Sequence, residues 1–181
     1  MSLTYGVAAL ARPTFDVPFA EDMKARAFAA LEAAGIRTVG PRELLFDRDA
    51  AERAVAQIRD AGPIDLLLIL QVTFTDATMT VKLAKEATTP IAIWAVPEPR
   101  SGGRLRLNAY CGLNLAAHAL GRAGVPRSAM AVSLNVTVTR TGAPGFVTVY
   151  PCDNEVPNAS QLNYGADVTL SASVVAKRNL T

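Results

Sequence analysis

The stretch D-L-L-L-I-L-Q, residues 65–71, decides the fold class of this chain. After Asp65 it runs apolar without alternation until Gln71, which is typical of a strand buried on both faces of a parallel sheet. Segments with helical spacing of apolar residues precede and follow it. Because parallel strands need crossover connections, this alternation predicts an α/β fold with a doubly wound, Rossmann-like or flavodoxin-like sheet.

The alternation continues in both directions from this strand. Pro and Gly punctuate the segments, and Asp or Thr residues suit the helix starts. The predicted order is a strand over 5–11, a helix over 18–34, a strand over 36–40, a helix capped by Asp47 or Asp49 and ended by Gly62, the strand over 66–71, a helix capped by Thr75 or Asp76 and running to Glu86, a strand over 91–96 and a helix over 114–122.

Charge is unevenly distributed along the 181 residues, although the net charge is only +2. Residues 1–124 carry 14 Lys or Arg and 13 Asp or Glu, whereas residues 125–181 carry 4 and 3. The chain is half apolar, which excludes a disordered tail, and the small basic excess is unlike a nucleic-acid module. The sequence therefore predicts an α/β domain over 1–124 and a β-rich extension over 125–181.

Features of membrane and secreted proteins are not found in the sequence. No apolar run approaches the roughly 20 residues of a membrane span, and the first residues do not resemble a signal peptide. Cys111 and Cys152 are too few for a disulfide framework, so we expect free thiols in a reducing cytoplasm. His118 lies in an apolar helical segment, which favours a hydrogen-bonded core position over a catalytic one.

The residues directly after the predicted strands form the candidate binding site, because ligands of open parallel sheets bind outside the carboxyl ends of the strands. An Arg fork can hold hydroxyls or a carboxylate, and the single Trp offers an apolar face to a sugar. This rule selects Arg12, Asp16, Gln71, Phe74, Trp94, Glu98 and Arg104. A purely structural interpretation is equally open, with Arg12 and Asp16 as a surface ion pair and Trp94 in the core.

Other chemistries have weaker support in the sequence. The loop over 101–104 (S-G-G-R) could hold a phosphate, but neither G-x-G-x-x-G after the first strand nor G-x-x-x-x-G-K-[ST] occurs. Asp16, Asp76 and Glu98 could surround a divalent cation if the fold gathered them. A complete metal site in this chain is not expected.

Four stretches carry a family resemblance: R-P-T-F-D at 12–16, L-Q-V-T-F-T-D-A at 70–77, I-W-A-V-P-E-P-R-S-G-G-R-L-R-L-N at 93–108 and C-G-L-N-L-A-A-H-A-L at 111–120. Together, residues 5–123 resemble the N-terminal region of the L-fucose isomerase-like proteins, which include the related L-arabinose isomerases. The resemblance covers about two thirds of the chain.

The resemblance implies a Rossmann-like domain that packs in a homo-oligomer and covers a neighbouring subunit's active site. These proteins interconvert aldoses and ketoses with a divalent cation, usually Mn²⁺, whose ligands lie in later domains. In the family an Arg and a Trp of the matching segments contact the sugar, and they correspond to Arg12 and Trp94. The likeness adds Asn108 to the candidate neighbours of that surface, beside Asp16, Gln71, Phe74, Glu98 and Arg104.

The tail departs from this family. Its segments over 131–139, 143–152, 158–164 and 171–177 resemble a β-rich repeat of secreted actinobacterial proteins. We expect residues 129–136 to add a fifth strand to the sheet and residues 142–151 to form a hairpin beside it.

Three functions follow as hypotheses. The first is an N-terminal domain of an aldose–ketose isomerase-like protein, which contacts sugar but is inactive alone because it lacks the metal ligands. The second is a structural or oligomerisation module without sugar activity. The third is a flavodoxin-like domain that binds a small phosphate or nucleotide. None of the three involves nucleic acid or a membrane.

Overall fold

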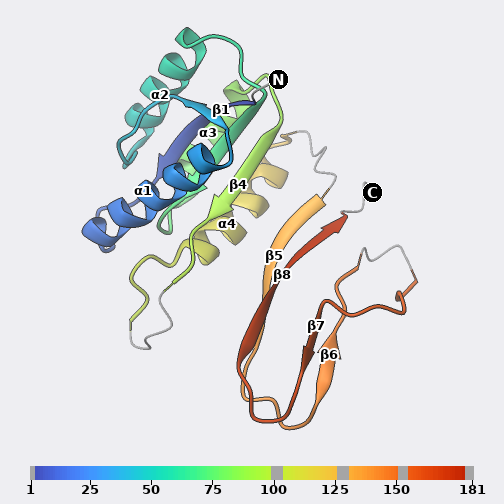
Figure 1. Ribbon diagram of the computed structural model, residues 1–181. Coiled ribbons are helices and arrows are strands. Elements are labelled where there is room, and N and C mark those ends of the chain that lie inside the picture. The colour runs from blue at the N-terminus through green and yellow to red at the C-terminus, as the bar shows by residue number, and fades with distance from the viewer. Residues whose placement is uncertain (1–2, 99–103, 126–130, 151–154, 178–181) are drawn as a thin grey trace. The chain divides into compact units, whose positions relative to one another are not determined.

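The computed structural model describes residues 3–98, 104–125, 131–150 and 155–177. The chain divides into two compact units, Met1–Pro126 and Arg127–Thr181. Figure 1 shows the helices and the four-stranded sheet in the first unit and two antiparallel ladders, one long and one short, in the second. Cys152 and the loop over 101–103, both named in the sequence analysis, lie outside the described residues.

The first unit alternates strictly between strands and helices. Its elements are β1 (Thr4–Leu10), α1 (Val17–Ala33), β2 (Arg37–Val39), α2 (Arg48–Asp60), β3 (Leu66–Gln71), α3 (Thr78–Glu86), β4 (Ile91–Ala95) and α4 (Ala109–Arg122). The strands form one parallel sheet in the order β2-β1-β3-β4. The predicted α/β class is therefore confirmed.

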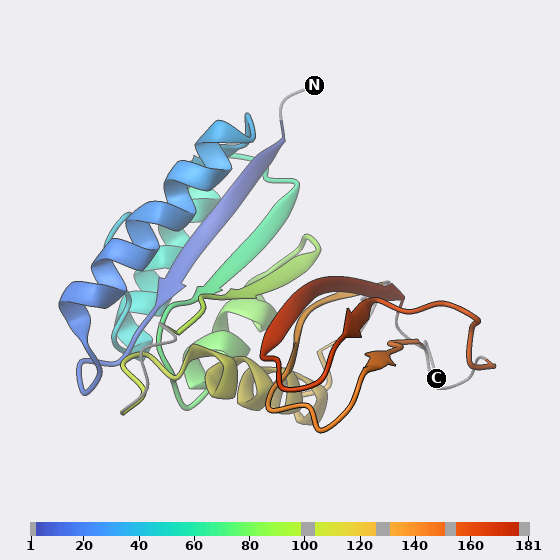
Figure 2. The same ribbon diagram turned by 60° about the horizontal axis from the view of Figure 1, so that its bottom comes forward.

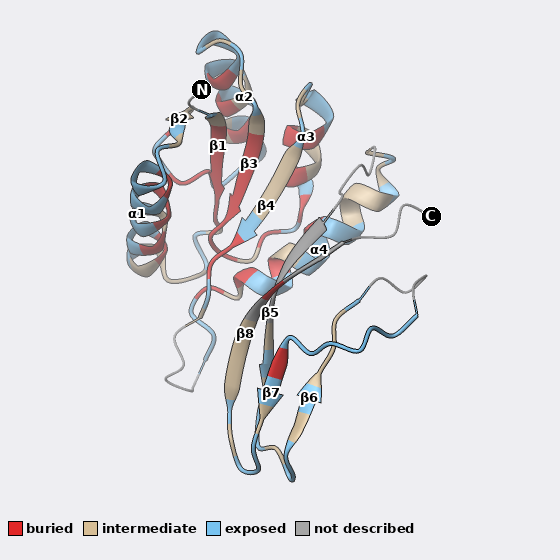
Figure 3. Cartoon of the chain, turned by 45° about the vertical axis from the view of Figure 1, so that its right-hand side comes forward, coloured by how far each residue is buried: buried red, intermediate tan, exposed pale blue. Residues whose placement is uncertain are grey.

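Helices cover both faces of this sheet, as Figure 2 shows. On one face Leu70 of β3 packs in a cluster with Met23 of α1. On the other face Ile69 packs with Ile58 of α2 and Leu83 of α3. The two central strands are consequently the most deeply buried part of the unit, coloured red in Figure 3. The continuous apolar run over 66–70 is explained by this burial on both faces.

Side-chain caps define the first two helices. Asp16 accepts a hydrogen bond from the Phe19 N–H at 3.0 Å at the start of α1. Asp47, and not Asp49, caps α2 by accepting from the Ala50 N–H at 2.7 Å. Each carboxylate satisfies an N–H that the helix itself cannot, which places the start of the helix.

The last two helices begin elsewhere than predicted. Helix α3 starts after Ala77, which has a left-handed φ of +67°, so neither Thr75 nor Asp76 occupies the cap position itself. Helix α4 starts at Ala109, earlier than the predicted 114, after Asn108 with φ +53°. The extra turn packs closely, because a Cβ on Gly112 would lie 3.0 Å from Phe74 Cα. This glycine permits an approach that the sequence alone did not indicate.

The second unit contains two antiparallel ladders. Strand β5 (Ala131–Val138) pairs along its whole length with β8 (Leu170–Lys177), and β6 (Gly145–Val147) pairs with β7 (Leu162–Tyr164). The predicted fifth strand is thus found in a ladder with β8, and the parallel sheet of the described residues has four strands. Likewise β6 pairs with β7 instead of forming a hairpin within 142–151. In both cases a partner distant in sequence offers the antiparallel edge.

Two further predictions concern single side chains. Cys111 is a free, exposed thiol, as expected. His118 is exposed on α4, so the prediction of a core histidine is wrong: the buried face of that helix carries Ala109, Gly112 and Ala116 instead. Within the described parts of the chain, no helix is both long and apolar enough to cross a membrane.

Candidate functional site

The strand order creates a natural binding position between β1 and β3. From β1 the chain moves to β2 on one side, and the next strand, β3, returns to the other side of β1. The connections leaving the carboxyl ends of β1 and β3 therefore diverge, which opens a crevice where parallel α/β sheets bind ligands. Arg12 follows β1 at this position, and Phe74 and Asp76 follow β3.

Arg12 is held in place from two sides and remains accessible. Its Nη2 lies 2.9 Å from Asp76 Oδ2, and its guanidinium carbon lies 5.9 Å from the centroid of the Phe74 ring. Its backbone N–H donates to Thr73 Oγ1 at 2.8 Å. The side chain is 38% exposed. A guanidinium has five N–H donors, so most of this fork is free to contact a ligand.

Asp76 is the anchor of that arginine. Its Oδ1 accepts from the Thr78 hydroxyl at 2.6 Å and from the Thr78 N–H at 3.1 Å. The Thr78 hydroxyl, then the Thr78 N–H and the Arg12 guanidinium, hold the pKa of Asp76 below its ordinary value, although partial burial acts in the opposite direction. The carboxylate is therefore charged at neutral pH and orients Arg12.

Asp16 does not pair with Arg12, so the structural interpretation of those two residues as an ion pair is wrong. Arg106 approaches Asp16 Oδ2 with Nε and Nη2, each at 2.8 Å, while its guanidinium carbon lies 4.0 Å from the centroid of the Phe19 ring. The Phe19 N–H, followed by Arg106, lowers the pKa of Asp16. Asp16 thus joins the start of α1 to the chain before α4.

Glu98 organises the chain that leads into α4. Its carboxylate accepts backbone N–H hydrogen bonds from Arg106 at 3.2 Å, from Leu107 at 2.6 Å and from Asn108. With three N–H donors on it, the carboxylate has a structural role. Asn108 itself is half-buried directly before α4.

The three carboxylates considered as metal ligands are used separately. Asp76 pairs with Arg12, Asp16 with Arg106, and Glu98 with backbone N–H groups. Among the residues that the structure describes, no three His, Cys, Asp or Glu side chains gather so that they could hold a metal ion.

Gln71 is completely buried at the end of β3. Its Nε2 donates to the Thr73 carbonyl at 2.6 Å and to Thr75 Oγ1 at 3.1 Å. Its Oε1 has no hydrogen-bond partner among the described residues. Gln71 therefore supports the turn that carries Phe74 and does not reach the surface.

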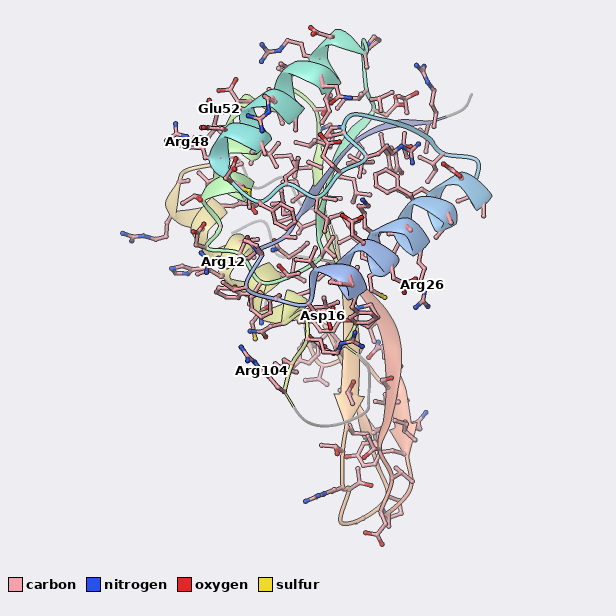
Figure 4. All side chains as sticks on the ribbon, turned by 90° about the vertical axis from the view of Figure 1, so that its left-hand side faces the viewer. Arg12, Asp16, Arg26, Arg48, Glu52 and Arg104 are labelled. Carbon is pink, nitrogen blue, oxygen red and sulfur yellow. The ribbon has the colours of Figure 1, made fainter. Side chains whose placement is uncertain are left out.

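Trp94 lies near the end of β4, and Arg104 lies in the chain that leads into α4. Side chains alternate along β4, and Ile93 packs with the α2 and α3 cluster, so Trp94 points to the face on which α1 packs. It is 38% exposed, which contradicts a core position. Arg104 is exposed in the segment before α4. Figure 4 shows Arg12, Asp16 and Arg104 on the ribbon.

Sequence reasoning missed Arg106, which makes the ion pair assigned to Arg12. The run R-L-R-L over 104–107 contained a signal, because alternation with leucine places Arg104 and Arg106 on one side of an extended segment. It could not indicate which of the two meets Asp16, since that depends on how the chain returns from β4.

Comparisons with known proteins find similarity to one part of certain sugar isomerases. The family model described as "Fucose/sulfoquinovose isomerase, N-terminal domain" matches residues 6–141. A sulfoquinovose isomerase of Priestia megaterium is 30% identical over 111 residues, which are 61% of this chain and 25% of that protein. A sulfoquinovose isomerase of Alkalicoccus urumqiensis is 27% identical over 111 residues, 61% of this chain and 24% of that protein.

The chain thus spans about a quarter of the length of the curated relatives it matches. A second Priestia protein, from Priestia aryabhattai, is also a sulfoquinovose isomerase and matches with the same 30% identity and coverage. No solved structure matches the chain.

Proposed function

The chain belongs to the family of fucose/sulfoquinovose isomerase N-terminal domains, and from that premise we propose that its first unit contributes sugar contacts to an aldose–ketose isomerase. The observation that carries the proposal is the accessible guanidinium of Arg12 at the crevice between β1 and β3. Asp76 fixes it, and the neighbouring Phe74 ring provides an apolar surface.

The chemistry of these groups suits a polyol. Arginine N–H groups donate to neighbouring hydroxyls, and an aromatic ring packs against sugar C–H bonds. Trp94 offers a second aromatic surface near the end of β4, where its side chain is 38% exposed. We propose that in a full-length family protein Arg12 and Trp94 serve the active site of a neighbouring subunit.

We propose that the divalent cation is bound by later domains of a full-length family protein. Asp16 and Asp76 are engaged in ion pairs and Glu98 in backbone hydrogen bonds. The resemblance implies that the ligands of Mn²⁺ lie in later domains. Such a metal would polarise the substrate oxygens, whereas the residues here would bind and orient the sugar. We expect no turnover of sugar by this chain alone. Its location in the cytoplasm stays a prediction.

Titration calorimetry and ¹⁵N NMR with L-fucose and sulfoquinovose test the sugar contacts. In the wild-type chain we expect amide shifts at Arg12, Phe74 and Asp76. Arg12→Gln removes the charged fork at an exposed position and should weaken binding about tenfold, the effect of losing charged hydrogen bonds.

Arg26→Gln is the matched control, because Arg26 is an exposed cation on α1 whose side chain is 69% exposed. It should leave the affinity unchanged. Equal affinity of the Arg12→Gln and wild-type chains would overturn the assignment of Arg12. Conversion of L-fucose to its ketose by the purified chain with Mn²⁺ would overturn the expected inactivity.

A further inference from the structure

A groove of about 400 Å³ adjoins the Arg12–Asp76 pair, and its described wall combines three cations and one carboxylate with Thr78 and the apolar Ala77, Val81 and Ala119. Its wall includes Arg48 at the start of α2, Asp76 and Thr78 at the start of α3, and Lys82 and Lys85 on α3. Three basic side chains thus meet one acidic side chain. The acidic one, Asp76, already pairs with Arg12 at 2.9 Å.

The carboxylates around the groove are shared between cations. Arg48 and Lys82 both approach Oε1 of Glu52, at 3.2 and 3.3 Å. Lys82 also lies 3.4 Å from Glu86, whose other oxygen lies 3.4 Å from Arg59. Since each carboxylate neutralises only one charge, the groove keeps a positive excess.

Lys85 adds a charge without a counterpart. It is exposed on α3, and no carboxylate lies within ion-pair distance of it in the described part of the chain. The positive surroundings also act on Glu52, whose pKa is lowered by Lys82 first and Arg48 second. Figure 4 shows Arg48 and Glu52 close together at the start of α2, away from Arg26 on α1.

We propose that this groove binds the anionic substituent, a sulfonate or phosphate group, of a sugar whose hydroxyls contact Arg12. The inference rests on the proposed function, because Asp76 belongs both to the groove wall and to the anchor of Arg12. Arginine and lysine N–H groups bind tetrahedral oxyanions through charge-assisted hydrogen bonds. The hydroxyls of a neutral sugar accept only weaker hydrogen bonds from these cations, so the groove favours charged sugars.

Three probes separate the anion from the sugar: L-fucose, which is neutral, sulfoquinovose, which carries a sulfonate, and methanesulfonate, which carries only the anion. Each is titrated into the wild-type, Lys85→Gln and Arg26→Gln chains, with ¹⁵N NMR as the readout. Lys85→Gln suits the test because the lysine makes no ion pair that folding would lose. Arg26→Gln removes the same charge from α1.

We expect sulfoquinovose to bind at least tenfold more tightly than L-fucose and to shift the amides of Thr78, Lys82 and Lys85. Lys85→Gln should weaken sulfoquinovose binding about threefold, as expected for one exposed charge, and leave L-fucose unaffected. Methanesulfonate should shift the same groove amides, and 0.5 M NaCl should suppress those shifts because salt screens exposed charges.

The outcomes also distinguish this proposal from the one on which it rests. Equal binding of sulfoquinovose by the wild-type and Lys85→Gln chains would overturn the groove while leaving the Arg12 sugar contact intact. If neither sugar binds but methanesulfonate still shifts the groove amides, the sugar proposal fails, and the groove is an anion site without a sugar. If methanesulfonate shifts no groove amide, the groove is not an anion site.

Discussion

The crevice after β1 and β3 and the chain after β4 use their charged residues in opposite ways. In the crevice Arg12 pairs with Asp76 through one guanidinium nitrogen, and its side chain remains 38% exposed. After β4, Glu98 accepts three backbone N–H groups, and Arg106 is engaged with Asp16 and Phe19. Residues of similar type and similar position at the strand ends therefore divide into an accessible group, which we propose contacts ligand, and a group that supports the chain, and only their hydrogen bonds tell them apart.

We expect the largest loss of stability from a substitution of Glu98. Glu98→Ala leaves three N–H groups before α4 without their acceptor, so we expect a loss of about 2 to 3 kcal/mol in the free energy of unfolding. Urea denaturation followed by circular dichroism measures the loss, and amide hydrogen exchange should accelerate at the start of α4. Glu98→Gln keeps an acceptor oxygen and should cost clearly less. A Glu98→Ala chain as stable as wild type would show that the three N–H bonds support nothing.

A substitution of Gln71, at the buried end of β3, tests whether this residue supports the chain or contacts a ligand. Gln71→Ala removes the hydrogen bonds to the Thr73 carbonyl and Thr75 and leaves a cavity, so we expect a loss of about 2 kcal/mol in the free energy of unfolding. Gln57→Ala on the exposed side of α2 is the control and should change stability by less than about 0.5 kcal/mol. A Gln71→Ala chain that keeps its stability but loses sugar affinity would return this residue to the ligand-contacting group.

The stabilisation by Asp16 should depend on pH. Because its pKa is lowered in the folded chain, its stabilising contribution is complete above the ordinary pKa of about 3.9 and disappears as pH falls through the lowered value. Asp16→Asn keeps a good helix cap but loses the charge. The variant should therefore melt slightly below wild type at pH 7, and the two melting temperatures should converge at acid pH. A difference in melting temperature that does not shrink as the pH falls would contradict the assignment.

The sequence predicts the α/β part of this molecule well, because its signals are local. The apolar run before Gln71 predicted the buried strand, and Asp47 gave a helix cap at the observed position. The rule of carboxyl-terminal strand ends placed Arg12 and Phe74 in one crevice. Each of these inferences needs only periodicity, a cap or the direction of a strand.

The inferences that failed depend on partners distant in sequence. The residue that pairs with Asp16 is Arg106, and the strand that takes up β5 is β8. Helix α4 starts early because Gly112 lets it approach Gln71 and Phe74. Local sequence patterns do not predict these contacts. The sequence could therefore indicate candidate site residues but not the role of each.

The position of β1 in the sheet has a consequence for how the domain folds. On one side it pairs with β3, and the Thr4 N–H reaches the Asp65 carboxylate across 61 residues of sequence. On the other side it pairs with β2 at Arg37–Val39, which closes a much shorter loop. Because longer loops cost more entropy to close, we expect β1 to pair with β2 before β3 completes the centre of the sheet.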